Sequence, residues 1–109
     1  MDAGGRLPLA PQSMDLCLMA TVLHEFVADG IADKVLQQVA EVLKPQGIAA
    51  VVEFKPQAGP PGPPRRVRLF PEEVAARLQP YGLTPCSEVT DLGPQIYLAQ
   101  FSRSSRSPV

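Results

Sequence analysis

Two stretches of the chain are apolar at nearly every position. They read Met-Asp-Leu-Cys-Leu-Met-Ala over residues 14–20 and Ile-Ala-Ala-Val-Val-Glu-Phe over residues 48–54. A strand with one face in water alternates apolar and polar residues, whereas a strand covered by helices on both faces is apolar throughout. The pattern therefore predicts two buried strands, each covered on both sides.

The segment between them has the period of a helix. From Asp29 to Lys44 the apolar residues return every three or four positions, and polar residues occupy the opposite side. The main apolar stripe consists of Ile31, Val35, Val39 and Val42. Either Asp29 or Asp33 is suited to cap the start, and Pro45 disfavours helical geometry at Lys44, which sets the end. A strand, a helix and a second strand in this order predict a right-handed crossover with parallel strands.

Proline and glycine dominate the next segment. Residues 56–64 exclude a helix or a central strand and predict an extended loop. Helical spacing resumes over residues 71–79, with Pro71 suited to the first helical position. Arginines 65, 66 and 68 lie between the two, and they are read either as contacts for an acidic substrate or as a solvated surface.

The end of the chain predicts an antiparallel hairpin. Two β-like runs, residues 85–91 and 95–102, are separated by a short Leu-Gly-Pro connection. Residues 103–109 carry too little apolar surface to offset the entropy of ordering, so they are predicted to be a disordered tail. Residues 1–102 then form one partial domain.

Composition limits the classes of partner that we expect for this chain. The chain has 109 residues and a formal net charge of −1, which gives no electrostatic reason to expect nucleic acid or an anionic membrane as a partner. It shows no signal peptide and no apolar run of spanning length, so we expect a cytoplasmic protein. Cys17 and Cys86 lack a metal-binding spacing and are expected to be packing residues, with no metal bound.

Three motifs resemble the second half of class I S-adenosylmethionine-dependent methyltransferases, of the small-molecule type 11-like kind. Residues 7–9 and 13–16 are similar to the "LPF…SFD" approach to the family's fourth strand, and residues 21–26 are similar to the "xLHH" segment after it. Residues 41–47 resemble "RVLKPGG", with 51–54 as the fifth strand. Gln46 replaces the usual first glycine of that motif.

The resemblance implies a fold and an activity. The fold is α/β, a partial Rossmann-like methyltransferase sheet made of a parallel strand-helix-strand unit, then a helix and an antiparallel hairpin. The activity is methyl transfer from S-adenosylmethionine to a small molecule. The glycine-rich turn and the acid that hold this cofactor in the family have no counterpart here, and Gly4-Gly5 neither follows a strand nor opens a helix. We therefore expect a truncated domain that is inactive or incomplete alone.

The resemblance and the strand ends together select the candidate site residues. Asp2 and Ala3 resemble the family's adenine-binding segment, and Thr21 and Val22 follow the first strand at the edge where ligands collect, so these four residues are the predicted cofactor contacts.

Two further candidates lie at the same edge. His24 is a candidate base, although a histidine in an apolar turn can also simply pack or cap a helix. Glu53 is a candidate substrate contact or merely the point where its strand leaves the core.

A non-catalytic function is also consistent with the sequence. The strand from Asp15 to Ala20 pairs in the family with a strand that this sequence lacks, so its edge is predicted to be unprotected. Exposed edges recruit partners. The chain would then be an interaction module, or a split or truncated subunit, that binds a protein partner or itself through this edge.

Overall fold

The chain forms a mixed sheet with helices on one side. The computed structural model describes residues 9–57, 62–64 and 68–103. The strands are β1 (Met14–Ala20), β2 (Leu43–Phe54), β3 (Leu83–Pro85), β4 (Thr90–Asp91) and β5 (Ile96–Arg103). The sheet order is β1-β2-β5-β3, with β4 also paired to β5. β1 and β2 are parallel, and β5 is antiparallel to its neighbours, which confirms the predicted α/β fold class.

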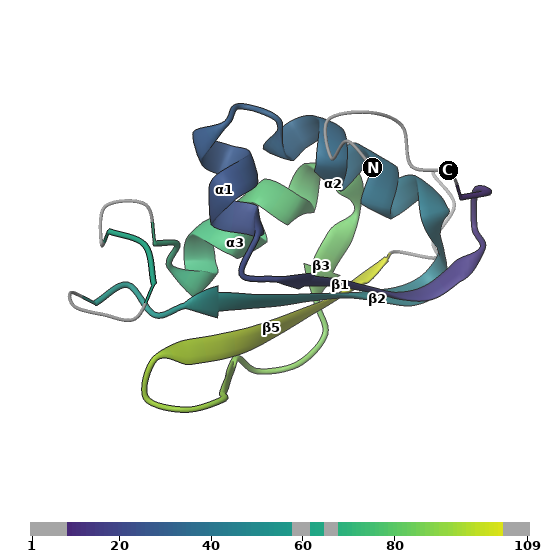
Figure 1. Ribbon diagram of the computed structural model, residues 1–109. Helices are drawn as coiled ribbons and strands as arrows, with labels where there is room; N and C mark the ends of the chain where they lie inside the picture. The colour runs from purple at the N-terminus through teal and green to yellow at the C-terminus, as the bar shows by residue number, and fades with distance from the viewer. Residues whose placement is uncertain (1–8, 58–61, 65–67, 104–109) are drawn as a thin grey trace.

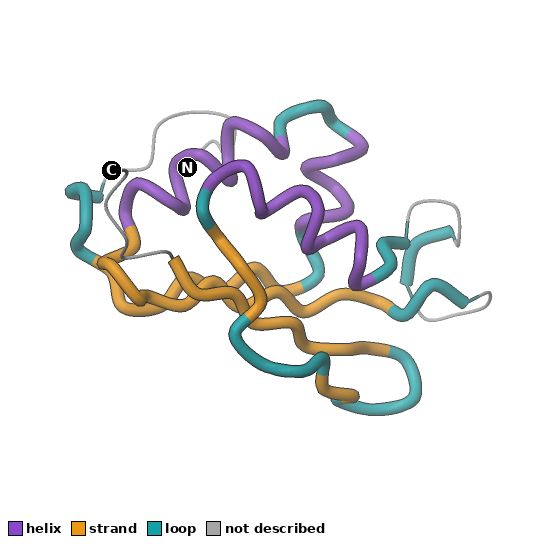
Figure 2. The backbone as a smooth tube through the Cα atoms, turned by 180° about the vertical axis from the view of Figure 1, so that it is seen from behind, coloured by secondary structure: helices purple, strands orange, loops and turns teal. Residues whose placement is uncertain are grey.

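The three α-helices that the structure describes all pack on the same face of the sheet. They are α1 (Leu23–Ala28), α2 (Ala32–Val42) and α3 (Pro71–Leu78), and α3 runs on into a short 3₁₀ helix, η2 (Gln79–Tyr81). Figure 1 shows them above the sheet, and Figure 2 shows the same arrangement from behind. None of the helices that the structure describes is long and apolar enough to cross a membrane.

The core lies between the helices and this covered face. Its largest fully buried side chains include Tyr97 and Phe101 from β5, Val51 from β2, and Leu23 and Leu36 from the helices. Apolar burial of this kind is the main favourable term in folding. The sheet therefore gains its stability from one side.

The opposite face corrects the prediction of strands covered on both sides. Met19 on β1 is buried, whereas its neighbours Leu16 and Leu18 are 57% and 61% exposed. β2 also differs between its faces, since Val51 is buried and Val52 only half-buried. Successive side chains of a strand point to opposite faces, and no described helix covers the second one (Figures 1 and 2). We call this surface the open face, defined by Leu16, Leu18, Ile48, Val52 and Leu98.

The link from α2 to β2 is tighter than the sequence predicts. The helix expected over residues 29–44 is the shorter α2, which ends at Val42, and a separate short helix, α1, precedes it. Met14 pairs with Leu43 and Leu16 pairs with Ile48, so residues 44–47 bulge out of the strand. Gln46 in that bulge has φ 67°, and a Cβ at Gly47 would meet the Lys44 carbonyl oxygen at 2.9 Å. This departure from "KPGG" puts a side chain where glycine is favoured.

The carboxyl-terminal strands are antiparallel as predicted, but two details differ. The run expected over residues 85–91 is divided into β3 and β4, with exposed residues 86–89 between them. Arg103, the first residue of the predicted tail, belongs to β5, and its guanidinium donates a hydrogen bond to the Leu43 carbonyl. Residues 104–109, the rest of that tail, lie outside the described residues.

Candidate functional site

The carboxyl ends of β1 and β2 meet beside the start of α1. The Thr21 backbone N–H donates to the Val52 carbonyl oxygen at 2.7 Å, which joins the two strand ends. α1 then begins at Leu23 without a polar side chain at its cap, since Val22 occupies that position. The fold thus brings Thr21, Val22, His24 and Glu53 to one place, the edge predicted from the sequence.

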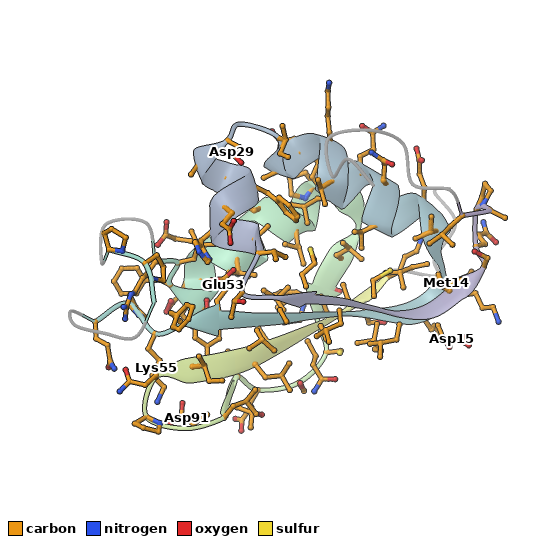
Figure 3. The ribbon with its side chains drawn as sticks, in the orientation of Figure 1. Met14, Asp15, Asp29, Glu53, Lys55 and Asp91 are labelled. Atoms are coloured by element: carbon orange, nitrogen blue, oxygen red, sulfur yellow. The ribbon has the colours of Figure 1, made fainter. Side chains whose placement is uncertain are left out.

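The central feature of this edge is a buried contact between His24 and Glu53. His24 Nδ1 lies 2.8 Å from Glu53 Oε1, and the His24 backbone N–H donates to Glu53 Oε2 at 3.0 Å. Figure 3 labels Glu53 where β2 passes beneath α1. The carboxylate therefore caps the helix that its own sequence leaves uncapped, because the first amides of a helix have no partner within it.

Both members of the pair are shielded from water. Glu53 is 0% exposed and His24 is 6% exposed. Within the part of the chain that the structure describes, no buried side-chain nitrogen or oxygen lacks a hydrogen-bond partner. A buried charge is tolerated when it is hydrogen-bonded in this way. The carboxylate of Glu53 faces His24, so its predicted contact with a substrate stays a prediction without support from this arrangement.

A cavity of about 510 Å³ opens next to the pair. Its lining includes His24 but not Glu53, and it is formed by Thr21, His24, Glu25, Ala28, Asp29, Phe54 and Pro63. The rings of His24 and Phe54 meet edge to face with centroids 6.3 Å apart. We call this the His24 cavity. It combines an imidazole, an aromatic ring and two carboxylates.

Arg68 stabilises one wall of the His24 cavity by contacts with Pro63 and Phe54. It is only 4% exposed, its Nε donates to the Pro63 carbonyl oxygen at 2.9 Å, and its Nη1 donates to the Lys55 carbonyl oxygen at 3.3 Å. Its guanidinium carbon lies 5.5 Å from the Phe54 ring centroid, within cation–π range. The reading of these arginines as a solvated surface is therefore wrong for Arg68. Arginines 65 and 66 lie outside the described residues.

Thr21 is held in an unusual backbone conformation. Its φ is 56°, which is rare for a β-branched residue, and its hydroxyl donates to the Ala20 carbonyl oxygen at 2.7 Å. Strained residues of this kind persist where neighbouring bonds fix them, and they gather at functional sites. The strand end at Thr21 is therefore rigidly placed beside the His24 cavity.

Tyr97 lies beside Glu53 on the covered face. The two residues are directly opposite in the β2–β5 ladder, and the Tyr97 hydroxyl donates to the Leu69 carbonyl oxygen at 2.7 Å. Burial, and then the nearby charge of Glu53, raise the pKa of Tyr97 well above its usual value. Tyr97 therefore stays a neutral hydrogen-bond donor at physiological pH.

The described residues fit one side of a site for S-adenosylmethionine. The carboxylates of Glu25 and Asp29 and the ring of Phe54 give the His24 cavity a lining that suits a positively charged group, as the sulfonium is. Asp2 and Ala3, the predicted adenine contacts, lie outside the described residues. Across residues 9–57, 62–64 and 68–103, no three His, Cys, Asp or Glu side chains gather in a way that could hold a metal ion.

The sequence missed two residues of this site. Phe54 was read only as the end of a strand, yet it lines the cavity. Arg68 was read as a substrate contact or as part of a solvated surface, yet it contacts the lining residues Pro63 and Phe54. A signal was present for Arg68, because an arginine that follows a proline-rich loop can bind the carbonyls that such a loop leaves unpaired.

Comparisons with known proteins agree with the fold. The model of a family described as a methyltransferase domain matches residues 1–51. No curated protein sequence matched the chain.

Solved methyltransferase structures match nearly the whole chain. A SAM-dependent methyltransferase from Aquifex aeolicus is 22% identical, with a TM-score of 0.81 over 94% of this chain and 52% of its own. A protein from Sulfolobus solfataricus described as a type 11 methyltransferase is 16% identical, with a TM-score of 0.79 over 94% of this chain and 57% of its own.

A third structure contains bound ligands. The 1,6-didemethyltoxoflavin-N1-methyltransferase from Burkholderia thailandensis, solved with 1,6-didemethyltoxoflavin and S-adenosylhomocysteine, is 17% identical, with a TM-score of 0.69 over 96% of this chain and 49% of its own. The chain thus spans about half the length of the structures it matches. The sheet and these matches show that the chain has the Rossmann-like fold of about half of a class I S-adenosylmethionine-dependent methyltransferase domain.

Proposed function

We propose that this protein transfers a methyl group from S-adenosylmethionine to a small-molecule acceptor in the cytoplasm, and that this chain supplies the acceptor side of the site. One observation supports the proposal most strongly. His24 lines a cavity at the carboxyl ends of two parallel strands, where open α/β sheets bind ligands, and its ring is held by a buried carboxylate. A polar group in a cavity with an apolar wall is the usual form of a small-molecule site.

In this proposal His24 acts as a general base. Nδ1 faces Glu53, so Nε2 is the nitrogen left to take a proton from an acceptor in the cavity. When bound, S-adenosylmethionine supplies an electrophilic methyl group, so the protein needs no strong nucleophile of its own. The chain's residues orient the acceptor, hold its proton and exclude water.

Cofactor binding is divided in this proposal. Thr21 and Val22, at the end of β1, and Asp2 and Ala3, near the amino terminus, would contact the cofactor from this chain. The glycine-rich turn and the ribose-binding acid would have to come from a first half. The isolated chain is therefore expected to bind the cofactor weakly and to be inactive.

Calorimetry tests the division. We expect no micromolar binding of S-adenosylmethionine by the isolated chain, and micromolar binding by a fusion that restores the first half from the Aquifex aeolicus relative. The same first half without this chain is the control. Micromolar binding by the isolated chain would contradict its incompleteness. Failure of a folded fusion to methylate any member of a panel of phenols, enols and amines would overturn the proposed activity.

A second candidate function is supported by the open sheet edge. β1 ends the sheet, pairs only with β2 among the strands that the structure describes, and exposes Leu16 and Leu18 on the open face. An apolar strand with unpaired backbone groups favours addition of another chain. In this alternative the chain is a non-catalytic module, or a split subunit, that binds a protein partner or a second copy through Asp15–Ala20.

Sedimentation analysis tests this alternative. We expect the isolated chain to associate reversibly as its concentration rises from micromolar to millimolar. A single monomeric species over the whole range would exclude self-association, and the fusion described above would then show whether a first half occupies the edge instead.

A further inference from the structure

A second cavity lies where β2 ends and the proline-rich segment begins. Its volume is about 360 Å³, and it is lined by Lys55, Pro56, Gln57, Pro71, Val89, Asp91 and Tyr97. None of these residues lines the His24 cavity. Phe54 and Lys55 are adjacent in the chain, and successive side chains of an extended segment point in opposite directions, so the two residues line separate cavities. We call the second one the Lys55 cavity.

The main chain of Lys55 is held on both sides. Its N–H donates to the Gln95 carbonyl oxygen at 2.8 Å, and its own carbonyl oxygen accepts from Arg68 Nη1 at 3.3 Å. The side chain that starts from this fixed point is only 23% exposed. A lysine ammonium that is largely removed from water needs an acceptor nearby, because an unpaired buried charge costs free energy.

The acceptor that now faces Lys55 is weakly placed. Lys55 Nζ lies 3.2 Å from Asp91 Oδ1, and Figure 3 labels both residues at the same end of the sheet. The Asp91 side chain is 75% exposed, and β4, to which it belongs, has only two residues. An ion pair with a largely hydrated carboxylate contributes little to stability. The ammonium can therefore exchange Asp91 for another carboxylate at small cost.

Most of the remaining lining is apolar, and it consists of Pro56, Pro71, Val89 and Tyr97. The Tyr97 hydroxyl is already bound to the Leu69 carbonyl oxygen, and the Gln57 amide nitrogen donates to the Pro94 carbonyl oxygen at 3.0 Å. Among the lining residues, all of which the structure describes, Lys55 is the only cationic side chain. An apolar wall with one charged group directed at it is the usual form of a small-molecule site.

We infer that the Lys55 cavity is a binding site for a small aromatic carboxylate. The carboxylate binds the Lys55 ammonium in place of Asp91, and the ring contacts the apolar wall. An aromatic ring covers much apolar surface with few rotatable bonds to order. A monoanion is favoured, because the charge of Asp91 stays near enough to repel the second charge of a phosphate monoester. This site goes beyond the proposed function, since it uses no residue assigned there to methyl transfer.

Nuclear magnetic resonance of the ¹⁵N-labelled chain tests the site without a cofactor. In a titration with benzoate we expect a Kd of about 1 mM, the range open to so small a ligand. The amide signals of Lys55, Val89 and Asp91 should move, whereas those of Thr21 and His24 should stay. Benzamide has nearly the same shape and no charge, so it should bind at least about 10-fold more weakly.

Three variants assign the binding to Lys55. Lys55→Met keeps an apolar stem and removes the charge, so it should weaken benzoate binding about 10-fold. Lys34→Met, an exposed change on α2, is the matched control and should leave the Kd unchanged. Asp91→Asn removes the competing carboxylate and should tighten benzoate binding about 3-fold. Since Asp91 is largely exposed, this variant keeps the test available if Lys55→Met fails to fold.

Three results would overturn the inference. The first is a set of shifts confined to Thr21 and His24, and the second is equal affinity for benzoate and benzamide. The third is weaker benzoate binding by Asp91→Asn, which would show that Asp91 helps to hold the ligand. Tighter binding of phenyl phosphate than of benzoate would overturn the choice of a monoanion. No methyl transfer is measured, so a negative result leaves the proposed function as it stands, and an inactive fusion leaves the Lys55 cavity unaffected.

Discussion

The two faces of the sheet are made by the same strands and have opposite characters. On the covered face β2 and β5 place Val51, Glu53, Tyr97 and Phe101 under three helices, all at 2% exposure or less. On the open face Val52 and Leu98 of the same strands are half-buried, and β1 is exposed at Leu18. The candidate site belongs to the covered face, so in this chain one side of the sheet provides both the core and the chemistry.

The largest expected effect comes from Phe101→Ala on the covered face. Removal of a fully buried ring from β5 leaves a cavity and should cost about 3–5 kcal/mol of the free energy of unfolding, a large share for a domain of this size. Leu98→Ala, on the same strand but on the open face, is the matched control and should cost less than half as much. Urea denaturation followed by circular dichroism measures both. Equal losses of unfolding free energy in the two variants would contradict the difference between the two faces.

A smaller effect is expected for Tyr97→Phe, also on the covered face. The variant leaves the Leu69 carbonyl oxygen without its buried donor and should cost about 1–2 kcal/mol at neutral pH. Since the pKa of Tyr97 is raised in the folded chain above its ordinary value of 10.0, the folded state binds more protons than the unfolded state above that pH. The tyrosine's contribution to stability is therefore present below pH 10 and is lost as pH rises further.

Urea denaturation at pH 7 and at about pH 11 checks the sign. The wild type should lose more stability between the two values than Tyr97→Phe does. A steeper alkaline loss in the variant would contradict the role of burial.

Gln46→Gly tests the bulge that leads from α2 on the covered face into the sheet. Gln46 has φ 67°, where glycine lacks the steric penalty of a side chain, so the variant should gain about 1 kcal/mol. Thermal denaturation measures the gain, and Gln37→Gly, in the middle of α2, should instead lose about 1 kcal/mol. A loss at both positions would show that the Gln46 side chain makes a compensating contribution.

The smallest change in stability is expected for Leu16→Lys combined with Leu18→Lys on the open face. Both side chains are more than half exposed, so the free energy of unfolding should change by less than about 0.5 kcal/mol for each. The effect should appear in association instead, because lysines on an edge strand oppose pairing. Sedimentation at millimolar concentration should show the variant as a monomer. A large loss of stability in a dilute sample would mean that the open face is part of the core.

The order of elements could be predicted because each part has a local signal. The apolar runs gave β1 and β2, the helical period gave most of α2, and Pro71 marked the first residue of α3. The parallel pairing of β1 with β2 follows from the crossover between them. These features depend on residues close in sequence, and the structure confirms them.

What could not be predicted depends on contacts between distant residues. An apolar run indicates that a strand is suited to burial on both faces. It does not indicate that Leu16 and Leu18 are exposed to solvent in this chain. α1 has six residues and Val22 at its cap, so it has neither the length nor the polar cap that marks a helix in sequence. The group that caps α1 is the carboxylate of Glu53, which lies 29 positions after His24 in the sequence.

The same limit explains the site. His24 and Glu53 were each selected by their place at a strand end, and the structure brings them together. Their roles toward each other follow only from the 2.8 Å contact, since nothing in the sequence links the two positions. Arg68 was misread because a run of arginines beside a loop usually faces water, whereas this one satisfies two backbone carbonyls.

The Arg68 contacts have a consequence for how this fold can diversify. Its guanidinium joins the carbonyls of Lys55 and Pro63, the residues where the proline-rich segment leaves β2 and returns toward α3. With both anchor points tied to one side chain, the intervening sequence can change in length or composition at little cost to the sheet, because closing a longer loop adds only a few tenths of a kcal/mol per inserted residue or less. Pro63 of this segment lines the His24 cavity, so under the proposed function exchange of this one segment would change the acceptor preference while Arg68 is retained.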